Sequence, residues 1–445
     1  TQRRALLVLA LLILSAFLSA LAATPAQTQY FYAPLPLAVF GTLHAVSFLA
    51  TERRARGIAA MGGAAILALA LTARLYGPGL AIVAQPDEWY PRKVHARGEL
   101  IAGLTGGRGP VLTLAPTHVL EGGGAIYPAF ATGPFAWRVA DLVAPDERAA
   151  LGLMGPTDFT EHLAIPPRAL LTSLDNDDEA EEAPLIAYAQ ANGYLPVDLP
   201  DEGTLWLSPL ADWGGLIRLG GMQLADGALD PGDERLVTLY LQAMASMDRD
   251  LNLLVRLMGG DGRELWRADG WPYGAPTSVW PVGEVRPDGY TITIPDDAAS
   301  GLYKLEASLY DPATLEPVGA PITAGVIRVG AEPSVGPPVA TLGDGITLHD
   351  PTVVAGAGAL DIRLIWQTAA PLPAGLVRFV QALDGSGRVA AQQDGPVMNG
   401  FLPAQAWPVE SPIADRITLD VPPGEYRVIT GFYDPETGQR LPVQI

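Results

Sequence analysis

The residues that could do chemistry in this sequence are few and lie far apart. Asp87 and Glu88 form an acidic pair that could act as a general base or bind a cation, although a solvated cap at a domain junction is the commoner role. The acidic run from Asp175 to Glu179 supplies the oxygen ligands that calcium prefers. It lacks the 1-3-5-7-9-12 spacing of an EF-hand loop, and acidic residues also favour the first turn of a helix. Both patterns therefore favour solvated turns over catalytic or metal sites.

Other catalytic and cofactor motifs are weak or missing from the sequence. The glycines at 122–124 do not directly follow a strand and lack the Lys-Ser/Thr of a P-loop, and no Gly-x-Ser-x-Gly of a hydrolase elbow occurs. The chain has no cysteine, which excludes disulfides, thiolate nucleophiles and Cys-ligated metal sites. Trp271 and Trp280 could stack on sugar rings, although aromatic residues of a sandwich more often pack its core. No catalytic constellation assembles from these residues.

The charge of the chain is strongly acidic and unevenly distributed. The sequence holds 28 Lys and Arg against 48 Asp and Glu, a formal net charge of −20. Residues 1–85 carry six arginines and one glutamate, a net +5, which leaves −25 for the remainder. A nucleic-acid partner is not expected, because binding to phosphates requires a clustered basic surface.

Three apolar runs lie in the basic N-terminal segment, at about residues 5–23, 35–50 and 57–75. A membrane span needs about 20 apolar residues. The first run also fits a cleaved signal peptide, but two further runs with a basic turn between them favour a multi-span protein. The positive-inside rule then places everything after Pro86 outside the cell. The sequence thus predicts three transmembrane helices in residues 1–85, the lipid bilayer as a partner, and a multi-pass cell-membrane location.

Residues 86–212 are predicted to form a small extracytoplasmic α/β domain. A helical stretch at 94–104 precedes a short buried strand at 110–114. A second strand at 169–174 is followed by a helix that ends near Gly193, and a third strand begins at Leu205. Because strands and helices alternate, we expect a small parallel sheet with right-handed crossovers.

The sequence after Trp213 repeats itself at fixed spacing. Short alternating strands separated by Gly, Pro and Asp are typical of β-sandwiches. Gln242 lies 27 residues before Asp269, and Gln367 lies 27 residues before Asp394. The connections that follow the two aspartates differ in length, so we expect the copies to diverge most there. If a ligand binds, this variable edge is where we expect it.

A second pair of motifs supports the repeat. The Gly-x-Tyr and Tyr-Asp-Pro motifs starting at Gly301 recur at identical spacing from Gly424. We therefore predict two tandem β-sandwich domains of the immunoglobulin-like or jelly-roll-like kind, at 213–331 and 335–445. The predicted fold class is a membrane-anchored multidomain protein with transmembrane helices, an α/β domain and two sandwiches.

Four segments of the α/β region resemble bacterial multi-spanning membrane glycosyltransferases of the GT-C class, in their extracytoplasmic part. These segments are 89–98 (WYPRKVHARG), 111–116 (VLTLAP), 121–128 (EGGGAIYP) and 131–138 (ATGPFAWR). The C-terminal pattern of Asp-Gly-Arg, Trp, Gly-x-Tyr and Tyr-Asp-Pro is similar to the sandwich often appended to such enzymes. The resemblance implies transfer of a sugar from a polyprenyl-phosphate donor to a glycan acceptor of the cell envelope.

The family's catalytic carboxylates lie in the first extracytoplasmic loop, which this chain lacks if it has only three spans. The chain also begins with Thr1 rather than Met. We therefore interpret it as the C-terminal portion of a glycosyltransferase that is inactive alone and holds no cofactor or metal. A divalent metal and the lipid-linked sugar would belong to the full-length parent. The candidate binding residues are Asp87, Glu88, His95, Glu121, Tyr127, Arg138, Trp271 and Trp280.

Two other interpretations remain open at this point. One is a non-enzymatic, membrane-anchored envelope protein that presents two carbohydrate- or protein-binding sandwiches. The other is a pure scaffold. Further spans and an acidic outer loop upstream of Thr1 would favour the enzyme, whereas a start codon just before Thr1 would favour the anchored binding protein.

Overall fold

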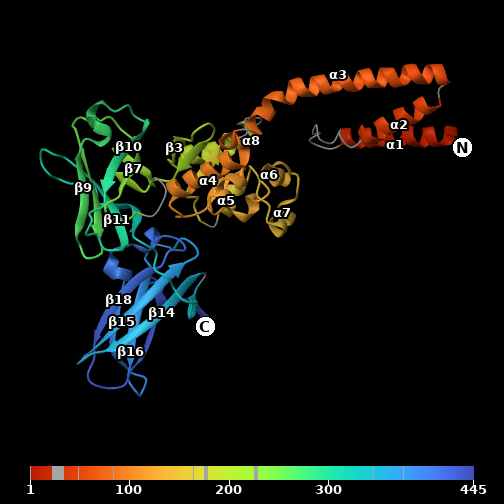
Figure 1. Ribbon diagram of the computed structural model, residues 1–445. Helices are drawn as coiled ribbons and strands as arrows, with labels where there is room; N and C mark the ends of the chain where they lie inside the picture. Colours follow the sequence, from red (N-terminus) through yellow and green to blue (C-terminus); the bar gives the residue numbers. More distant parts are fainter. Residues whose placement is uncertain are drawn as a thin grey trace. The chain divides into compact units, whose positions relative to one another are not determined.

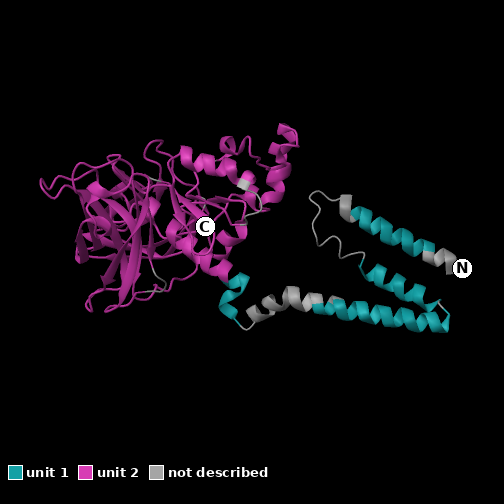
Figure 2. Ribbon diagram, turned by 90° about the horizontal axis from the view of Figure 1, so that it is seen from above, with its two compact units in different colours: residues 1–92 teal, residues 93–445 magenta. Residues whose placement is uncertain are grey.

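A computed structural model describes residues 2–22, 35–48, 50–83, 85–163, 165–174, 179–224, 229–343, 345–373 and 375–444. The chain divides into two compact units, residues 1–92 and 93–445 (Figure 2). The first unit is helical, and the second contains the β-strands (Figure 1).

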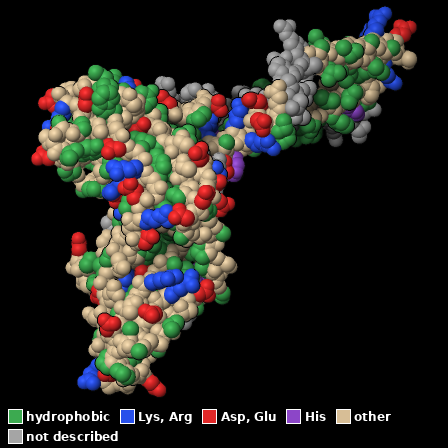
Figure 3. Space-filling view, turned by 60° about the vertical axis from the view of Figure 1, so that its left-hand side comes forward, with side chains coloured by type: hydrophobic (Ala, Val, Ile, Leu, Met, Phe, Trp, Pro, Cys, Tyr) green, Lys and Arg blue, Asp and Glu red, His purple; other side chains and the backbone are tan. Residues whose placement is uncertain are grey.

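The first unit contains three helices, α1 (Gln2–Ala22), α2 (Leu35–Ser47) and α3 (Thr51–Val83), followed by the short 3-10 helix η2 (Pro86–Glu88). α1 and α2 pack together at Gly41, where a β-carbon would lie 3.0 Å from the Leu9 Cδ2 atom. Many apolar side chains of these helices, among them Leu11 and Phe40, lie on the surface of the unit (Figure 3).

The three predicted transmembrane spans are wrong. Within the part of the chain that the structure describes, no helix is both long enough and apolar enough to cross a membrane. The 13 residues of α2 extend only about 20 Å, against a hydrocarbon core of about 30 Å. α3 begins with a charged turn that includes Glu52 and Arg53, and the side chains of α1 are described only for residues 7–19. The membrane-anchored fold class and the multi-pass location depended on these spans and are corrected with them.

The second unit begins with a four-stranded sheet in the order β1-β2-β4-β3. Its strands are β1 (Val111–Thr113), β2 (Ala169–Thr172), β3 (Leu195–Asp198) and β4 (Thr204–Leu207). Only β1 and β2 are parallel, so the predicted parallel sheet is wrong for the other two pairs. The five-residue connection between β3 and β4 is far too short for a crossover, and such a connection can only join antiparallel strands.

Helices cover both faces of this sheet. The neighbouring β1 residues Val111 and Leu112 belong to two different hydrophobic clusters, because successive strand residues face opposite sides. α4 and α5 contribute to the Val111 cluster, whereas α6 and α8 contribute to the Leu112 cluster. The α-helices of this region are α4 (Tyr90–Thr105), α5 (Pro116–Glu121), α6 (Pro134–Ala140), α7 (Pro145–Leu151) and α8 (Glu179–Ala191).

The glycine run after Glu121 has a packing role. A β-carbon on Gly122 would lie 2.0 Å from the carbonyl oxygen of Gly98, so the end of α5 contacts the backbone of α4 directly. Only glycine permits this approach at either position. The glycine run therefore packs the end of α5 against α4. This packing role agrees with the sequence, in which the run lacks the features of a phosphate-binding loop.

The first sandwich encloses one core between sheets ordered β10-β7-β6-β5 and β12-β11-β8-β9 (Figure 1). Its strands are β5 (Ala211–Trp213), β6 (Ile217–Leu224), β7 (Glu234–Ala243), β8 (Asn252–Gly259), β9 (Glu264–Gly270), β10 (Val285–Thr293), β11 (Gly301–Tyr310) and β12 (Ile322–Val329).

The second sandwich repeats this order in sheets β18-β15-β14-β13-β20 and β17-β16-β19. Its strands are β13 (Ala340–Leu342), β14 (Ile346–Ala355), β15 (Ala359–Thr368), β16 (Val377–Leu383), β17 (Val389–Gly395), β18 (Ile413–Asp420), β19 (Arg427–Tyr433) and β20 (Val443–Gln444). The last strand differs, because β12 pairs with β11 whereas β20 pairs with β13.

The anchor residues of the sequence repeat make equivalent contacts in the two sandwiches. The Tyr310 hydroxyl donates to Asp269 at 2.7 Å, and the Tyr433 hydroxyl donates to Asp394 at 3.3 Å. Gly301 opens β11, whereas Gly424 lies three residues before Arg427, the first residue of β19. The shared strand order and contacts support a common backbone for the two copies. The predicted boundaries near 213 and 335 stay predictions, since contacts divide the chain only at Arg92.

Candidate functional site

The connection between β9 and β10 carries the most exposed aromatic side chains of the first sandwich. β9 lies at the edge of one sheet and β10 at the edge of the other, so residues 271–284 cross from sheet to sheet. The connection contains two 3-10 turns, η5 (Pro272–Gly274) and η6 (Thr277–Val279). It is also the variable edge at which the sequence analysis places a ligand, if one binds.

The base of this connection is anchored in the sandwich. The Thr277 hydroxyl accepts a hydrogen bond from the Leu251 amide at 2.9 Å and donates to the Arg249 carbonyl at 3.3 Å. Thr277 is fully buried, and Trp280 is only 4% exposed in the core between the sheets. The structure thus places Trp280 in the core, in line with the packing role, and Trp271 on the surface.

Two half-exposed aromatic rings stand on this base, and we call Trp271 and Tyr273 the aromatic platform. Each side chain is 48% exposed. Tyr273 has a φ of 57°, a left-handed conformation that a bulky residue rarely adopts, and it is followed by Gly274 at φ 64°. Residues held in such conformations cluster at binding sites, because the surrounding structure must enforce them.

Arg286 lies between the exposed and the buried aromatic ring. Its Cζ atom is 4.9 Å from the centroid of the Tyr273 ring and 5.6 Å from that of the Trp280 ring. A guanidinium over an aromatic face contributes about 0.5–1 kcal/mol at an exposed site. The cation therefore supports the Tyr273 ring from within the sandwich.

Asp288 holds the backbone of the platform. Its carboxylate is buried and accepts hydrogen bonds from the Tyr290 hydroxyl and from the amide of Tyr273. Burial raises the pKa of Asp288 above its ordinary value, and burial and the adjacent carboxylate both raise the pKa of Tyr290. Tyr273 is thus held through its ring by Arg286 and through its backbone by Asp288.

The equivalent connection of the second sandwich has lost the platform. Pro396 and Met398 stand in place of Trp271 and Tyr273, and Met398 keeps the left-handed backbone with a φ of 53°. Met398 and Phe401 instead approach the first sandwich, since a β-carbon on Gly260 would lie 3.3 Å and 3.6 Å from their side-chain carbons. The connection of the second sandwich therefore contacts the first sandwich, whereas the connection of the first sandwich keeps its two aromatic rings exposed.

The remaining sequence candidates do not gather around the platform. His95 and Glu121 lie close to each other, with ring nitrogen and carboxylate 3.6 Å apart on α4 and α5, and the His95 ring also lies 3.3 Å from Glu99. Both partners are about half exposed, so this is a contact on the surface of the unit. In the described residues no group of three potential His, Cys, Asp or Glu ligands is positioned for a metal.

The other candidates have structural partners. The Tyr127 hydroxyl donates to the Ile165 carbonyl at 2.5 Å, and burial raises the pKa of Tyr127. Arg138 pairs with Glu181. Asp87 pairs with Arg92 at 3.0 Å in the first unit, where Glu88 ends η2. The acidic run at 175–178 lies outside the described residues.

Sequence reasoning missed Tyr273, Arg286 and Asp288. The Trp-Pro-Tyr-Gly sequence at 271–274 was the available signal, because proline and glycine favour an exposed turn that displays the aromatic rings. Arg286 and Asp288 carry no such signal, since their role depends on the pairing of β10 with β7. No family model and no curated protein matches the chain, so the glycosyltransferase resemblance stays untested.

Proposed function

We propose that the chain is a carbohydrate-binding protein whose aromatic platform holds a glycan. The observation that carries the proposal is the pair of half-exposed rings, Trp271 and Tyr273, on an anchored connection at the edge of the first sandwich. The glycan acceptor implied by the glycosyltransferase resemblance is the ligand class that this surface suits. Binding, rather than transfer, is the function that we assign to the described residues.

The chemistry of the platform favours sugars over other ring-shaped ligands. The face of a pyranose ring presents C–H groups, so it can cover an aromatic ring while its hydroxyls stay in water. Covering about 60 Å² of each ring contributes about 1.5 kcal/mol per ring. Nucleobases also stack on such platforms, but they bring phosphates, which the acidic chain with its net charge of −20 disfavours.

The rigidity of the platform reduces the entropic cost of binding. Tyr and Trp have only two side-chain torsions each, and Pro272 separates the two residues. Arg286 and Asp288 further restrict Tyr273. With about 3 kcal/mol from both rings and additional polar contacts, we expect dissociation constants near the millimolar range.

Calorimetric titration of oligosaccharides into the chain, after a glycan-array screen, tests the proposal. Trp271→Ala should weaken binding about tenfold, because it removes about 1.5 kcal/mol. Trp271→Phe retains a ring and should bind with intermediate affinity. The matched control is Phe135→Ala, which removes an aromatic side chain that is 62% exposed on α6.

Two results would contradict carbohydrate binding at this site. The first is the absence of any glycan that binds the wild-type chain. The second is equal affinity of the wild type and Trp271→Ala for every glycan that does bind. Binding of a protein that Trp271→Ala abolishes, without glycan binding, would favour the protein-binding alternative instead.

A further inference from the structure

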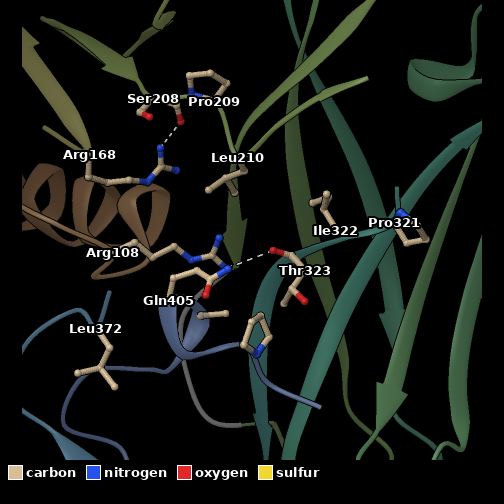
Figure 4. Close-up of a pocket in the computed structure, with 12 residues that line it drawn as sticks. Arg108, Arg168, Ser208, Pro209, Leu210, Pro321, Ile322, Thr323, Leu372 and Gln405 are labelled. Carbon is tan, nitrogen blue, oxygen red and sulfur yellow. Dashed lines mark hydrogen bonds between the residues drawn. The ribbon is translucent and has the colours of Figure 1, made fainter. Parts of the chain in front are cut away.

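A cavity of about 440 Å³ lies where the α/β region meets the two sandwiches, entirely within residues 93–445 (Figure 4). Residues from all three parts line it, among them Arg108, Arg168, Ser208, Thr323, Leu372 and Gln405. A second cavity of about 210 Å³ adjoins it and shares both arginines. Figure 4 shows the two guanidinium groups entering from the α/β side, with Thr323 opposite Arg108.

The lining of both cavities is positively charged. Among the described residues, it contains two arginines and no acidic residue. In the described part of the chain, neither Arg108 nor Arg168 forms a salt bridge. Burial lowers the pKa of Arg108 to about 10, and burial together with the charge of Arg108 lowers the pKa of Arg168 to about 9. Arg168 is buried and Arg108 is partly buried. A buried cation without a counter-charge among the described residues is costly, and a bound anion would offset that cost.

Arg168 is held in place by backbone carbonyls. Its Nη2 donates to Gly220 at 2.7 Å and to Leu104 at 3.4 Å, its Nε donates to Thr105 at 3.3 Å, and its Nη1 donates to Ser208. These four bonds leave one of the five N–H donors of the guanidinium. Arg168 therefore acts as a fixed positive charge and contributes at most one direct contact to a ligand.

Arg108 is the arginine with donors to spare. Among the described residues, its guanidinium donates hydrogen bonds only through Nη2, at 3.4 Å to the Thr323 carbonyl and 3.3 Å to the Ala324 carbonyl, and both are long. Its Nε and Nη1 groups have no hydrogen-bond partner among these residues, and the side chain lines the cavity. The planar guanidinium fork matches two oxygens of a phosphate, and the neighbouring Arg168 adds the second charge that a phosphate dianion requires.

We propose that this cavity binds a phosphate group, with Arg108 as its direct ligand and Arg168 as the supporting charge. The cavity is much larger than an inorganic phosphate ion, and the adjoining cavity is lined by apolar side chains such as Met222 and Leu224. A phosphate ester fills this space better than the free ion. The site is separate from the aromatic platform, so its test is independent of carbohydrate binding.

Calorimetric titration of the whole chain with inorganic phosphate and with glycerol 3-phosphate, an ester without a sugar ring, at constant ionic strength, tests the site. We expect saturable binding, at least tenfold weaker in Arg108→Ala and partly retained in Arg108→Lys, which keeps the charge but loses the fork. Arg388→Gln is the matched control, because it removes an arginine whose side chain is 83% exposed. Trp271→Ala should leave phosphate binding unchanged.

The two probes distinguish the sources of phosphate. Tighter binding of glycerol 3-phosphate supports an ester, and equal binding supports the free ion at the same arginines. Absence of saturable binding to both probes would overturn the proposal, as would equal affinity in Arg108→Ala. Circular dichroism shows whether the Arg108 variants are folded. If Arg108→Ala does not fold, the phosphate affinity of Arg108→Lys still tests the proposal.

Discussion

Replacing Asp415 by Ala should destabilise the second sandwich by about 3–5 kcal/mol, because it leaves a buried guanidinium without its counter-charge. Arg378 and Asp415 are 0% and 1% exposed, and the Arg378 Nε lies 3.0 Å from the Asp415 Oδ2. The other carboxylate oxygen accepts the Met398 amide at 2.9 Å. The substitution thus removes the ion pair and one anchor of the connection that contacts the first sandwich.

The refuting experiment is the joint replacement of both partners. If the loss in Asp415→Ala comes from the orphaned charge, Arg378→Met combined with Asp415→Leu should recover most of the stability, since apolar residues of similar volume often replace a buried pair without loss. Urea unfolding, with hydrogen exchange of β15 and β16 to localise the effect, measures both variants. A double variant as unstable as Asp415→Ala would refute the buried-charge explanation.

Two further predictions concern the platform and the α4–α5 contact. Because the pKa of Asp288 is raised in the folded chain, stability should fall as pH rises from about 4 through that pKa, and Asp288→Asn should remove this loss in urea unfolding between pH 4 and 8. If the stability of Asp288→Asn depended on pH as that of the wild type does, Asp288 would not be the source of the loss. Gly122→Ala should lower the thermal midpoint, because its β-carbon would lie 2.0 Å from the Gly98 carbonyl oxygen, whereas Gly103→Ala, with nothing within 4 Å, should gain about 0.5–1 kcal/mol. Equal midpoints for these two variants would show that the close approach is not the reason for the glycine.

The apolar N-terminal segment shows where composition alone misleads. An apolar run in the sequence predicts a span, but it does not show where the helix begins and ends. α2 stops after 13 residues, and α3 takes up the charged turn that begins at Thr51. The helix boundaries depend on local backbone contacts, and hydropathy gives no information about these contacts.

The tandem arrangement of the sandwiches could be predicted from the sequence, because alternation along a strand tolerates no one-residue shift without turning the core face outward. The fixed spacing of Gln242 and Asp269, and of their counterparts Gln367 and Asp394, therefore signals a repeated backbone. The order of strands in the two sandwiches agrees with that signal. Local patterns of this kind are written in consecutive residues and can be seen without a structure.

Only the tertiary structure decides which of two equivalent connections stays open. Trp271 and Met398 belong to connections of the same form in the first and the second sandwich. The connection that contains Met398 lies against Gly260 of the first sandwich, whereas the connection that contains Trp271 leaves its aromatic side chains exposed. Tertiary contacts also bring Arg108 and Arg168, 60 positions apart in the sequence, to one cavity whose described lining residues include no acid. Exposure and the absence of a counter-charge depend on what every other segment covers, and no local pattern of residues records that.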